Sequence, residues 1–296
     1  MPQTRLMINH ASTFPLQYEL KDVPFFPQEE YQCGPASLAT LLTTKHISVT
    51  PEELKSKVYL PQRKGSLQLE MIASVRQYDL VPYVLKPELS DLFTEVIAGN
   101  PVLVLQNLGL DWFPVWHYAV VVGFNMQTQE VILRSGTTQR QLTDMSVFER
   151  TWARSNRWAM VIVAPNQTPA TANELDFLKS AAKFEKIGKF KLAEQAYNAA
   201  LIKWPKSLNI RLALANNYYS LKDYEQAERI LKEAIEIHPD SMIAHNNLAH
   251  ILMVQNKLLP ALSMAKKALE LAGGANSVAQ QTYQQIQKRI TDSHQP

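Results

Sequence analysis

Apolar positions divide the chain into a mixed first part and a helical second part. In the first part, apolar residues at helical spacing predict helices over about 34–45, from 50, from 66, over 90–98 and over 143–152. Runs rich in Val, Ile and Leu predict strands at 81–85, 101–106, 118–124, 130–134 and 157–164. Helices followed by an antiparallel sheet predict an α+β domain over 18–165, preceded by a flexible arm over 1–17.

The second part, residues 174–296, has no strand pattern and repeats itself. It follows a linker over 166–173 that contains Pro169 and comes directly after Pro165. Pro205 and Pro239 lie 34 residues apart, and alanines recur at the same spacing at three registers: Ala181, Ala215, Ala249; Ala193, Ala227, Ala261; Ala200, Ala234, Ala268. This is the tetratricopeptide period. It predicts an all-α solenoid of three repeats, over 174–207, 208–241 and 242–275, closed by a polar capping helix.

The first helix of each repeat is expected to line a concave face. The residues at the registers expected there are Asn216, Tyr219, Asn246 and His250. They are candidates for binding a partner or an extended peptide, and simple solvation is the alternative for each of them.

Composition narrows the classes of function. The net charge is +3, from 30 basic and 27 acidic residues, so no strong field favours nucleic acid. No apolar run reaches 18 residues, so we predict no transmembrane segment. No glycine-rich phosphate loop or metal-ligand spacing is present, so we predict no cofactor and no metal. A single cysteine excludes an internal disulfide.

That cysteine stands in the segment with the clearest chemistry, PQEEYQCGPASLATLL. Cys33 precedes Gly34 and Pro35, and an apolar run follows, so it lies where a loop enters a helix. Proline suits a first helical turn. The partial positive charge of a helix N-terminus favours thiolate over thiol, which would prepare Cys33 as a nucleophile. A buried, inert cysteine is the alternative.

A nucleophile needs a base and an oxyanion donor. His117 opens the apolar run HYAVVVGF, so it lies at the mouth of a predicted strand, where it can face the helix that carries Cys33. Gln28 lies five residues before Cys33, and its side-chain amide can donate to an oxyanion beside the Cys33 N–H.

These motifs together resemble the papain-like bacterial cysteine peptidases that remove double-glycine leader peptides from bacteriocins. The chain is most similar to their stand-alone relatives with C-terminal tetratricopeptide repeats. The resemblance covers about 18–165 and the repeats, and it implies that Cys33 is the nucleophile, His117 the base and Gln28 the oxyanion donor. Two positions depart from the family pattern. The glutamine usually lies six residues before the cysteine, and Ser135-Gly136 stands where the family has Asp-Pro.

Ser135 is therefore the candidate third member of the site. The strand at 130–134 should pair with the His117 strand through the turn at 125–129. We predict that the hydroxyl or carbonyl of Ser135 accepts a hydrogen bond from His117. Trp112, Trp116 and Gly34 are candidate substrate contacts, and for the two tryptophans the alternative is that they cover the sheet edge.

The resulting hypothesis is a cysteine peptidase that cleaves a peptide or leader with small, Gly-Gly-like residues at the cleavage site, while the repeats recruit the substrate or a protein partner. A degenerate peptidase that binds a peptide without cutting is the alternative. A third hypothesis is that Cys33 forms a thioester with the substrate, which then reacts in transpeptidation or deamidation instead of peptide hydrolysis.

The resemblance also implies a location. Its repeat-bearing members suggest the bacterial cell envelope, on the periplasmic side, as a lipoprotein whose signal has been removed. The N-terminus shows no secretory h-region, and a cytoplasmic location is the alternative.

Overall fold

The computed structural model describes residues 1–9, 14–28, 32–60, 62, 65–273 and 277–293. It divides into two compact units, Met1–Ser180 and Ala181–Pro296. The division falls within helix α7 (Glu174–Lys186). The predicted helix from 174 is therefore present, and its first half groups with the N-terminal unit.

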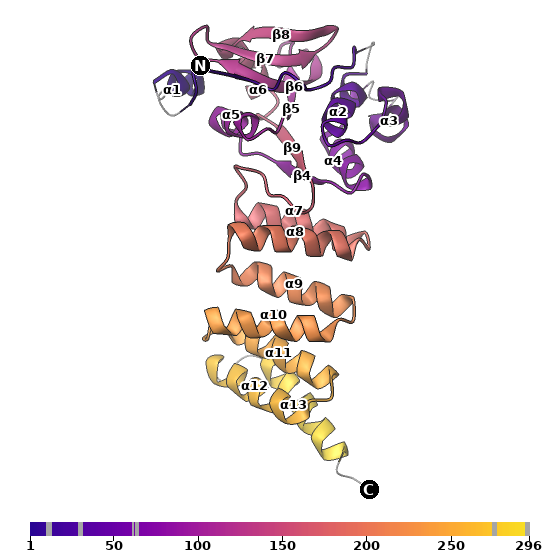
Figure 1. Ribbon diagram of the computed structural model, residues 1–296, viewed down its shortest axis with the longest axis vertical. Helices are drawn as coiled ribbons and strands as arrows, with labels where there is room; N and C mark the ends of the chain where they lie inside the picture. Colours follow the sequence, from indigo (N-terminus) through magenta and orange to yellow (C-terminus); the bar gives the residue numbers. More distant parts are fainter. Residues whose placement is uncertain (10–13, 29–31, 61, 63–64, 274–276, 294–296) are drawn as a thin grey trace. The chain divides into compact units, whose positions relative to one another are not determined.

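An antiparallel sheet is the centre of the N-terminal unit (Figure 1). Its strands follow the order β4-β9-β5-β6-β7-β8, and β1 pairs with the end of β6. The strand bounds are β1 Gln17–Glu19, β4 Val81–Val84, β5 Val102–Asn107, β6 Trp116–Asn125, β7 Glu130–Ser135, β8 Thr138–Asp144 and β9 Ala159–Val163. A second, two-stranded sheet joins β2 (Tyr59–Leu60) to β3 (Gly65–Ser66).

Helices cover the sheet because alternate strand residues bury their side chains on each face. The helices of this unit are α1 Pro2–Asn9, α2 Cys33–Thr43, α3 Pro51–Val58, α4 Gln68–Gln77, α5 Leu89–Ile97 and α6 Met145–Ala153. Leu105 and Tyr118 belong to one apolar cluster with residues of α2, α3 and α4. The next residue, Gln106, donates to Thr151 of α6, so α6 lies on the opposite face. The predicted α+β fold is confirmed.

The N-terminal segment differs from the flexible arm that we predicted. Helix α1 is held by Glu149 of α6, which is fully buried. Its carboxylate accepts from the N–H of Gln3 at 3.2 Å and from the N–H of Thr4 at 2.8 Å. The N–H groups of a helix start lack intrahelical partners, so a carboxylate satisfies them well. Because this partner lies so far away in the sequence, local patterning gave no sign of it. Residues 10–13 of the predicted arm lie outside the described residues.

Strand β8 was also absent from the sequence prediction. Its residues are mostly polar and exposed, so they lack the apolar alternation that marks a strand. The strand forms because a tight turn, with Gly136 at φ +57°, folds it back onto β7.

The C-terminal unit is a row of antiparallel helices. Beyond α7 they are α8 Phe190–Lys203, α9 Leu208–Ser220, α10 Tyr224–Ile237, α11 Met242–Val254, α12 Leu258–Leu271 and α13 Ser277–Asp292. All nine repeated alanines are at most 2% exposed, so they are the close-packing positions that the period predicts. The turn inside each helix pair uses a left-handed residue at the same register, namely Gly188, Lys222 and Asn256. The predicted repeat solenoid is confirmed.

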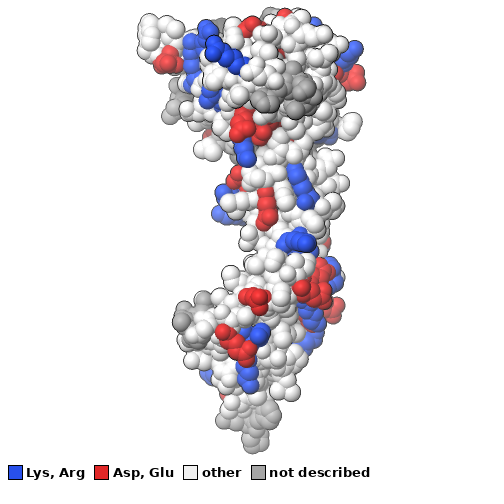
Figure 2. Space-filling model, turned by 90° about the vertical axis from the view of Figure 1, so that its left-hand side faces the viewer, with Lys and Arg blue, Asp and Glu red and all other residues white. Residues whose placement is uncertain are grey.

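Charges of both signs are interspersed on the face drawn in Figure 2. This agrees with the small net charge. Among the described residues, no helix combines the length and the hydropathy needed to cross a bilayer.

Candidate active site

Cys33 is the first residue of α2, and its thiol lies against the beginning of β6. The nine residues that follow it in the helix, from Gly34 to Leu42, are buried, so α2 is fixed firmly in the unit. Backbone N–H groups of Tyr118, Gly34 and Cys33 itself donate to the sulfur. The Tyr118 N–H belongs to the peptide group that joins it to His117. The fold thus brings the two predicted catalytic residues together.

Burial shifts the pKa values of both Cys33 and His117. Burial raises the pKa of the Cys33 thiol, and the three N–H donors only partly oppose it. Burial also lowers the pKa of the His117 imidazole. Both shifts favour the neutral forms. Burial therefore opposes the resting thiolate predicted from the helix N-terminus, because the loss of solvent outweighs the donors. His117 is the group beside the thiol that can take its proton.

Ser135 lies behind His117, as the strand pairing predicts. Its Oγ is 2.9 Å from Nε2 of His117. Strand β7 runs antiparallel to β6, with Arg134 opposite Val120, so the end of β7 returns to the start of β6. Because Ser135 engages Nε2, Nδ1 is the nitrogen left to face the thiol. The predicted contact is confirmed, while a catalytic role for Ser135 stays a prediction.

Arg134, the neighbour of Ser135, makes its hydrogen bonds with backbone carbonyl groups. It is buried, and its guanidinium donates to three carbonyl oxygens, those of Lys21, Val23 and Gln139. These bonds tie the segment before Gln28 to β7 and β8, so Arg134 supports the site without touching His117 in any of its hydrogen bonds.

Gln28 lies in the site, and its amide nitrogen is near two protein acceptors. Its Nε2 is 3.3 Å from Oγ of Ser37 and 3.4 Å from the carbonyl oxygen of Tyr118. Ser37 lies one helical turn beyond Cys33 and donates to the same carbonyl at 3.2 Å. The amide nitrogen is thus used by protein acceptors, so the predicted direction of this donor is not observed. The Cys33 N–H has no intrahelical acceptor and lies beside its own sulfur, so it remains a candidate oxyanion donor.

Gly34 has a packing role, and the substrate contact predicted for it stays a prediction. It is buried, and a Cβ built on it would lie 2.3 Å from Oγ and 2.7 Å from Cβ of Ser66. Only glycine allows α2 to approach β3 this closely. The site therefore requires a glycine after its cysteine for steric reasons.

Comparison with protein families agrees with this geometry. Residues 20–160 match the model of the Peptidase_C39 like family, and residues 188–251 match a tetratricopeptide-repeat model. The N-terminal unit contains a Peptidase_C39-like domain. The C-terminal unit contains tetratricopeptide repeats.

Solved structures resemble the two parts separately. A protein described as a C39-like peptidase from Bacillus anthracis is 17% identical, with 50% of this chain and 97% of that chain covered and a TM-score of 0.42. The first repeat domain of human RPAP3 is 21% identical, with 40% and 93% covered and a TM-score of 0.38. The Sgt2 repeat domain from Aspergillus fumigatus is 16% identical, with 44% and 87% covered and a TM-score of 0.40. The comparison with curated proteins gave no match.

A hairpin extends the C39-like domain next to His117. Leu108 donates to Val115, and Leu110 and Phe113 exchange two backbone hydrogen bonds. The base of the hairpin is held by buried Asn107, whose Oδ1 accepts from the N–H groups of Gly109 and Val115. The hairpin is therefore an ordered projection that leads directly into the strand carrying the base.

This hairpin exposes an unusual amount of apolar surface. Trp112 is 81% and Trp116 53% exposed, so neither covers the sheet edge. Four further large apolar residues of the hairpin are exposed, Leu108, Leu110, Phe113 and Val115. Sequence reasoning pointed to the aromatic residues of this loop and missed the three aliphatic ones, Leu108, Leu110 and Val115, although the density of apolar residues in a loop could have indicated them. Concentrated apolar surface of this kind is typical of a binding site.

The candidate contacts of the repeats differ in accessibility. Asn216 and Tyr219 are exposed, and His250 is half-buried, with its ring centroid 5.5 Å from that of Tyr219. Asn246 is only 8% exposed, so its assignment to a partner-binding surface is wrong for this conformation. It packs between helices instead.

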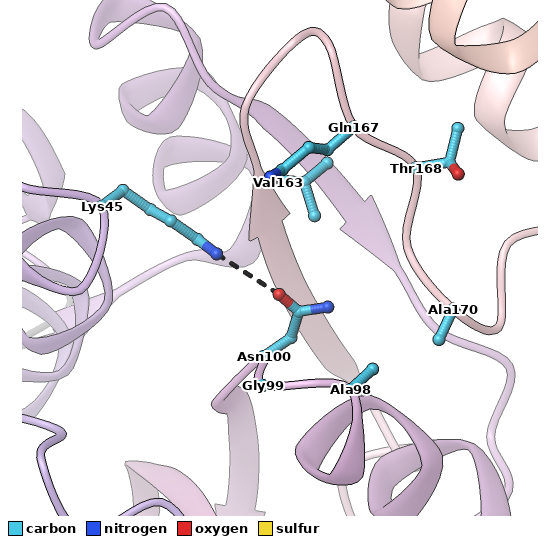
Figure 3. Close-up of a pocket in the computed structure, with 8 residues that line it drawn as sticks. All are labelled: Lys45, Ala98, Gly99, Asn100, Val163, Gln167, Thr168 and Ala170. Atoms are coloured by element: carbon cyan, nitrogen blue, oxygen red, sulfur yellow. Dashed lines mark hydrogen bonds between the residues drawn. The ribbon is translucent and has the colours of Figure 1, made fainter.

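A pocket of about 490 Å³ lies elsewhere in the N-terminal unit (Figure 3). It is lined by Lys45, Asn100, Gln167, Thr168 and four residues that contribute little polar surface, Ala98, Gly99, Val163 and Ala170. None of the candidate catalytic residues lines it, so the pocket is a separate feature.

Proposed function

We propose that this protein is a cysteine peptidase that cleaves a peptide with small residues, such as Gly-Gly, at the cleavage site. The observation that carries the proposal is the arrangement around Tyr118. Its N–H donates to the Cys33 sulfur, and the adjacent His117 is held by Ser135. A thiol, a base and a group that orients the base are the parts that acyl transfer through cysteine requires.

In the proposed mechanism, Nδ1 of His117 takes the thiol proton as the Cys33 sulfur attacks the scissile carbonyl carbon. The Cys33 N–H stabilises the developing oxyanion. His117 then gives the proton to the leaving amine, the C–N bond breaks and a thioester forms. Water, deprotonated by His117, attacks the thioester and releases the acid, which restores the thiol.

The preference for small residues rests on the resemblance to double-glycine leader peptidases. The exposed hairpin supports a second part of the proposal, in which Trp112 and Trp116 contact apolar residues of the substrate beside the cleavage site. Truncating Trp112 to Ala should then raise KM more than it lowers kcat, because the contact lies outside the reacting atoms.

The repeats serve in this proposal to recruit the substrate or a partner protein. The exposed pair Asn216 and Tyr219, with His250 beside them, is the proposed contact region. Peptide-bound repeat domains occur among the similar structures, one of them the first repeat domain of RPAP3 with a heat-shock-protein peptide.

A second function is favoured by one observation. The amide nitrogen of Gln28 is bonded to Ser37 and Tyr118, so the side-chain oxyanion donor is occupied in this structure. A domain that holds a peptide without cutting it would show the same arrangement.

A mixture of defined peptides containing Gly-Gly, Gly-Ala and Ala-Ala pairs distinguishes the two functions. We expect the intact protein to produce new termini after the small pair, detected by mass spectrometry, and Cys33→Ala to produce none. Binding of the same peptides without any cleavage by the intact protein would favour the peptide-holding function.

A further inference from the structure

The pocket in Figure 3 is built where several segments of the N-terminal unit meet. Lys45 follows the last turn of α2, Asn100 follows α5, and Gln167 and Thr168 belong to the segment after β9. Its volume of about 490 Å³ is within the range of small-molecule sites, roughly 300–1,000 Å³.

The ammonium group of Lys45 in this pocket has few hydrogen-bond partners in the part of the chain that the structure describes. The ammonium group of Lys45 makes one hydrogen bond among the described residues, to Oδ1 of Asn100 at 3.3 Å, which is a long contact with a neutral acceptor. An ammonium has three N–H donors. Figure 3 shows the lysine side chain extended toward Asn100. Burial lowers the pKa of Lys45, and the charge of Glu95 opposes this shift.

Glu95 does not pair with the lysine directly. Its Oε1 accepts from the N–H and the hydroxyl of Thr171, both at 2.7 Å, and its Oε2 accepts from Nδ2 of Asn100 at 2.8 Å. Asn100 therefore stands between the carboxylate and the ammonium. The donors that remain on Lys45 are available to a ligand.

The other wall adds donors. Figure 3 shows the side chain of Gln167 extending into the pocket, whereas that of Thr168 points away from Lys45 and Asn100. Within the described residues the Gln167 side chain has no hydrogen-bond partner. Its amide N–H groups and the Lys45 ammonium can both donate to an acceptor on a ligand.

We propose that this pocket binds a small molecule through a single carboxylate group, which pairs with Lys45 and accepts from Gln167. A carboxylate fits better than a phosphate dianion for two reasons. The buried Glu95 carboxylate lies one side chain beyond Lys45, and both α2 and α5 end at the pocket, where helix termini carry partial negative charge. Each of these repels a second negative charge on the ligand.

The site is distinct from the proposed active site. Helix α2 has 11 residues, and a helix rises about 1.5 Å per residue, so Cys33 and Lys45 are separated by roughly 16–18 Å along it. Carboxylate binding at Lys45 does not require peptidase activity, so its test is independent of the proposed function.

The test uses the full chain with ¹³C-methyl-labelled alanine, since Ala98 and Ala170 line the pocket. N-acetylglycine is titrated beside N-acetylglycinamide, which lacks only the negative charge, and beside inorganic phosphate at pH 8. We expect the acid to shift the Ala98 and Ala170 methyl resonances in a saturable way. The amide should shift them at least about tenfold more weakly, since a hydrogen bond to a charged group is lost, and phosphate should also bind more weakly.

Lys45→Met should abolish these shifts, whereas Lys55→Met, which removes a half-buried lysine of α3 that does not line the pocket, should leave them unchanged. Equal shifts with acid and amide, shifts that persist in Lys45→Met, or no shift at Ala98 and Ala170 with any of the probes would each overturn the proposal. Tighter binding of phosphate than of the acid would overturn the choice of a carboxylate.

Discussion

At the scale of single residues, burial shifts the pKa values of Cys33 and His117 toward their neutral forms. Proton transfer from Cys33 to His117 therefore has to precede or accompany the attack. Ser135 is a neutral partner, so it orients the imidazole without stabilising its charged form as a carboxylate would. These features predict a slower nucleophile than a preformed ion pair.

Alkylation of Cys33 by iodoacetamide should show this directly. The thiolate reacts, and the pKa of the thiol is raised by burial, so at any pH below that pKa the thiolate fraction is smaller than for an ordinary thiol. The rate at pH 6 should be below that of free cysteine and should rise with pH to beyond pH 9. A plateau of fast alkylation at pH 6, measured by intact mass, would show an ion pair and contradict the neutral resting state.

Substitution of Ser135 tests the group behind His117. Ser135→Ala removes a neutral hydrogen bond and should lower kcat/KM about two- to tenfold. Ser135→Asp should hold or raise kcat/KM. A carboxylate at this place favours the imidazolium and raises the pKa of His117, so the acid limb of the pH profile should move to higher pH. If neither variant changes the rate or the acid limb, Ser135 does not orient the base.

At the scale of elements, α2 is placed by close approach to β3 and by burial along its length. The position of α2 was predictable, because Pro35 and the following apolar run mark a helix start and a buried helix. The close contact between Gly34 and Ser66 was not predictable, since Ser66 belongs to a short strand that is distant in the sequence. Likewise β8 depends on its pairing with β7, and α1 on the carboxylate of Glu149, so local sequence patterns could not reveal them.

Gly34→Ala should destabilise the N-terminal unit by roughly 1–3 kcal/mol, because the new methyl group overlaps Ser66 and the packed helix cannot move away. Urea denaturation measures the effect. Ser66→Gly removes the overlapping atoms, so adding Gly34→Ala to that variant should cost little or nothing. An equal cost in both backgrounds would show that the contact with Ser66 is not the cause.

At the scale of the whole molecule, the chain joins a C39-like domain to a repeat array, and both were predictable because their signals are local or periodic. The boundary between the two units was harder to predict. The composition changes near residue 172, yet the compact units divide after Ser180, since the first half of α7 groups with the sheet domain. The direction of the Gln28 amide was beyond the sequence, because it depends on which acceptors the fold places nearby.

Two fragments test the independence of the repeats. Residues 172–296 retain all of α7 and should give a helical protein with a cooperative thermal transition by circular dichroism. Residues 181–296 lack the first half of α7, including buried Phe177, and should melt at a lower temperature, because a short helix without its packing surface is marginal. An unfolded 172–296 fragment would mean that the repeats depend on the C39-like domain.

The most direct measurement of the proposed chemistry is the detection of an acyl group on Cys33. The protein is mixed with acetyl-Gly-Gly p-nitrophenyl ester and quenched in acid within seconds, and its mass is measured before and after proteolysis. We predict one added acetyl-Gly-Gly group, located on the peptide that contains Cys33, and its absence from Cys33→Ala. Acylation elsewhere on the chain, or none while free thiols react, would contradict the role of Cys33 as the nucleophile.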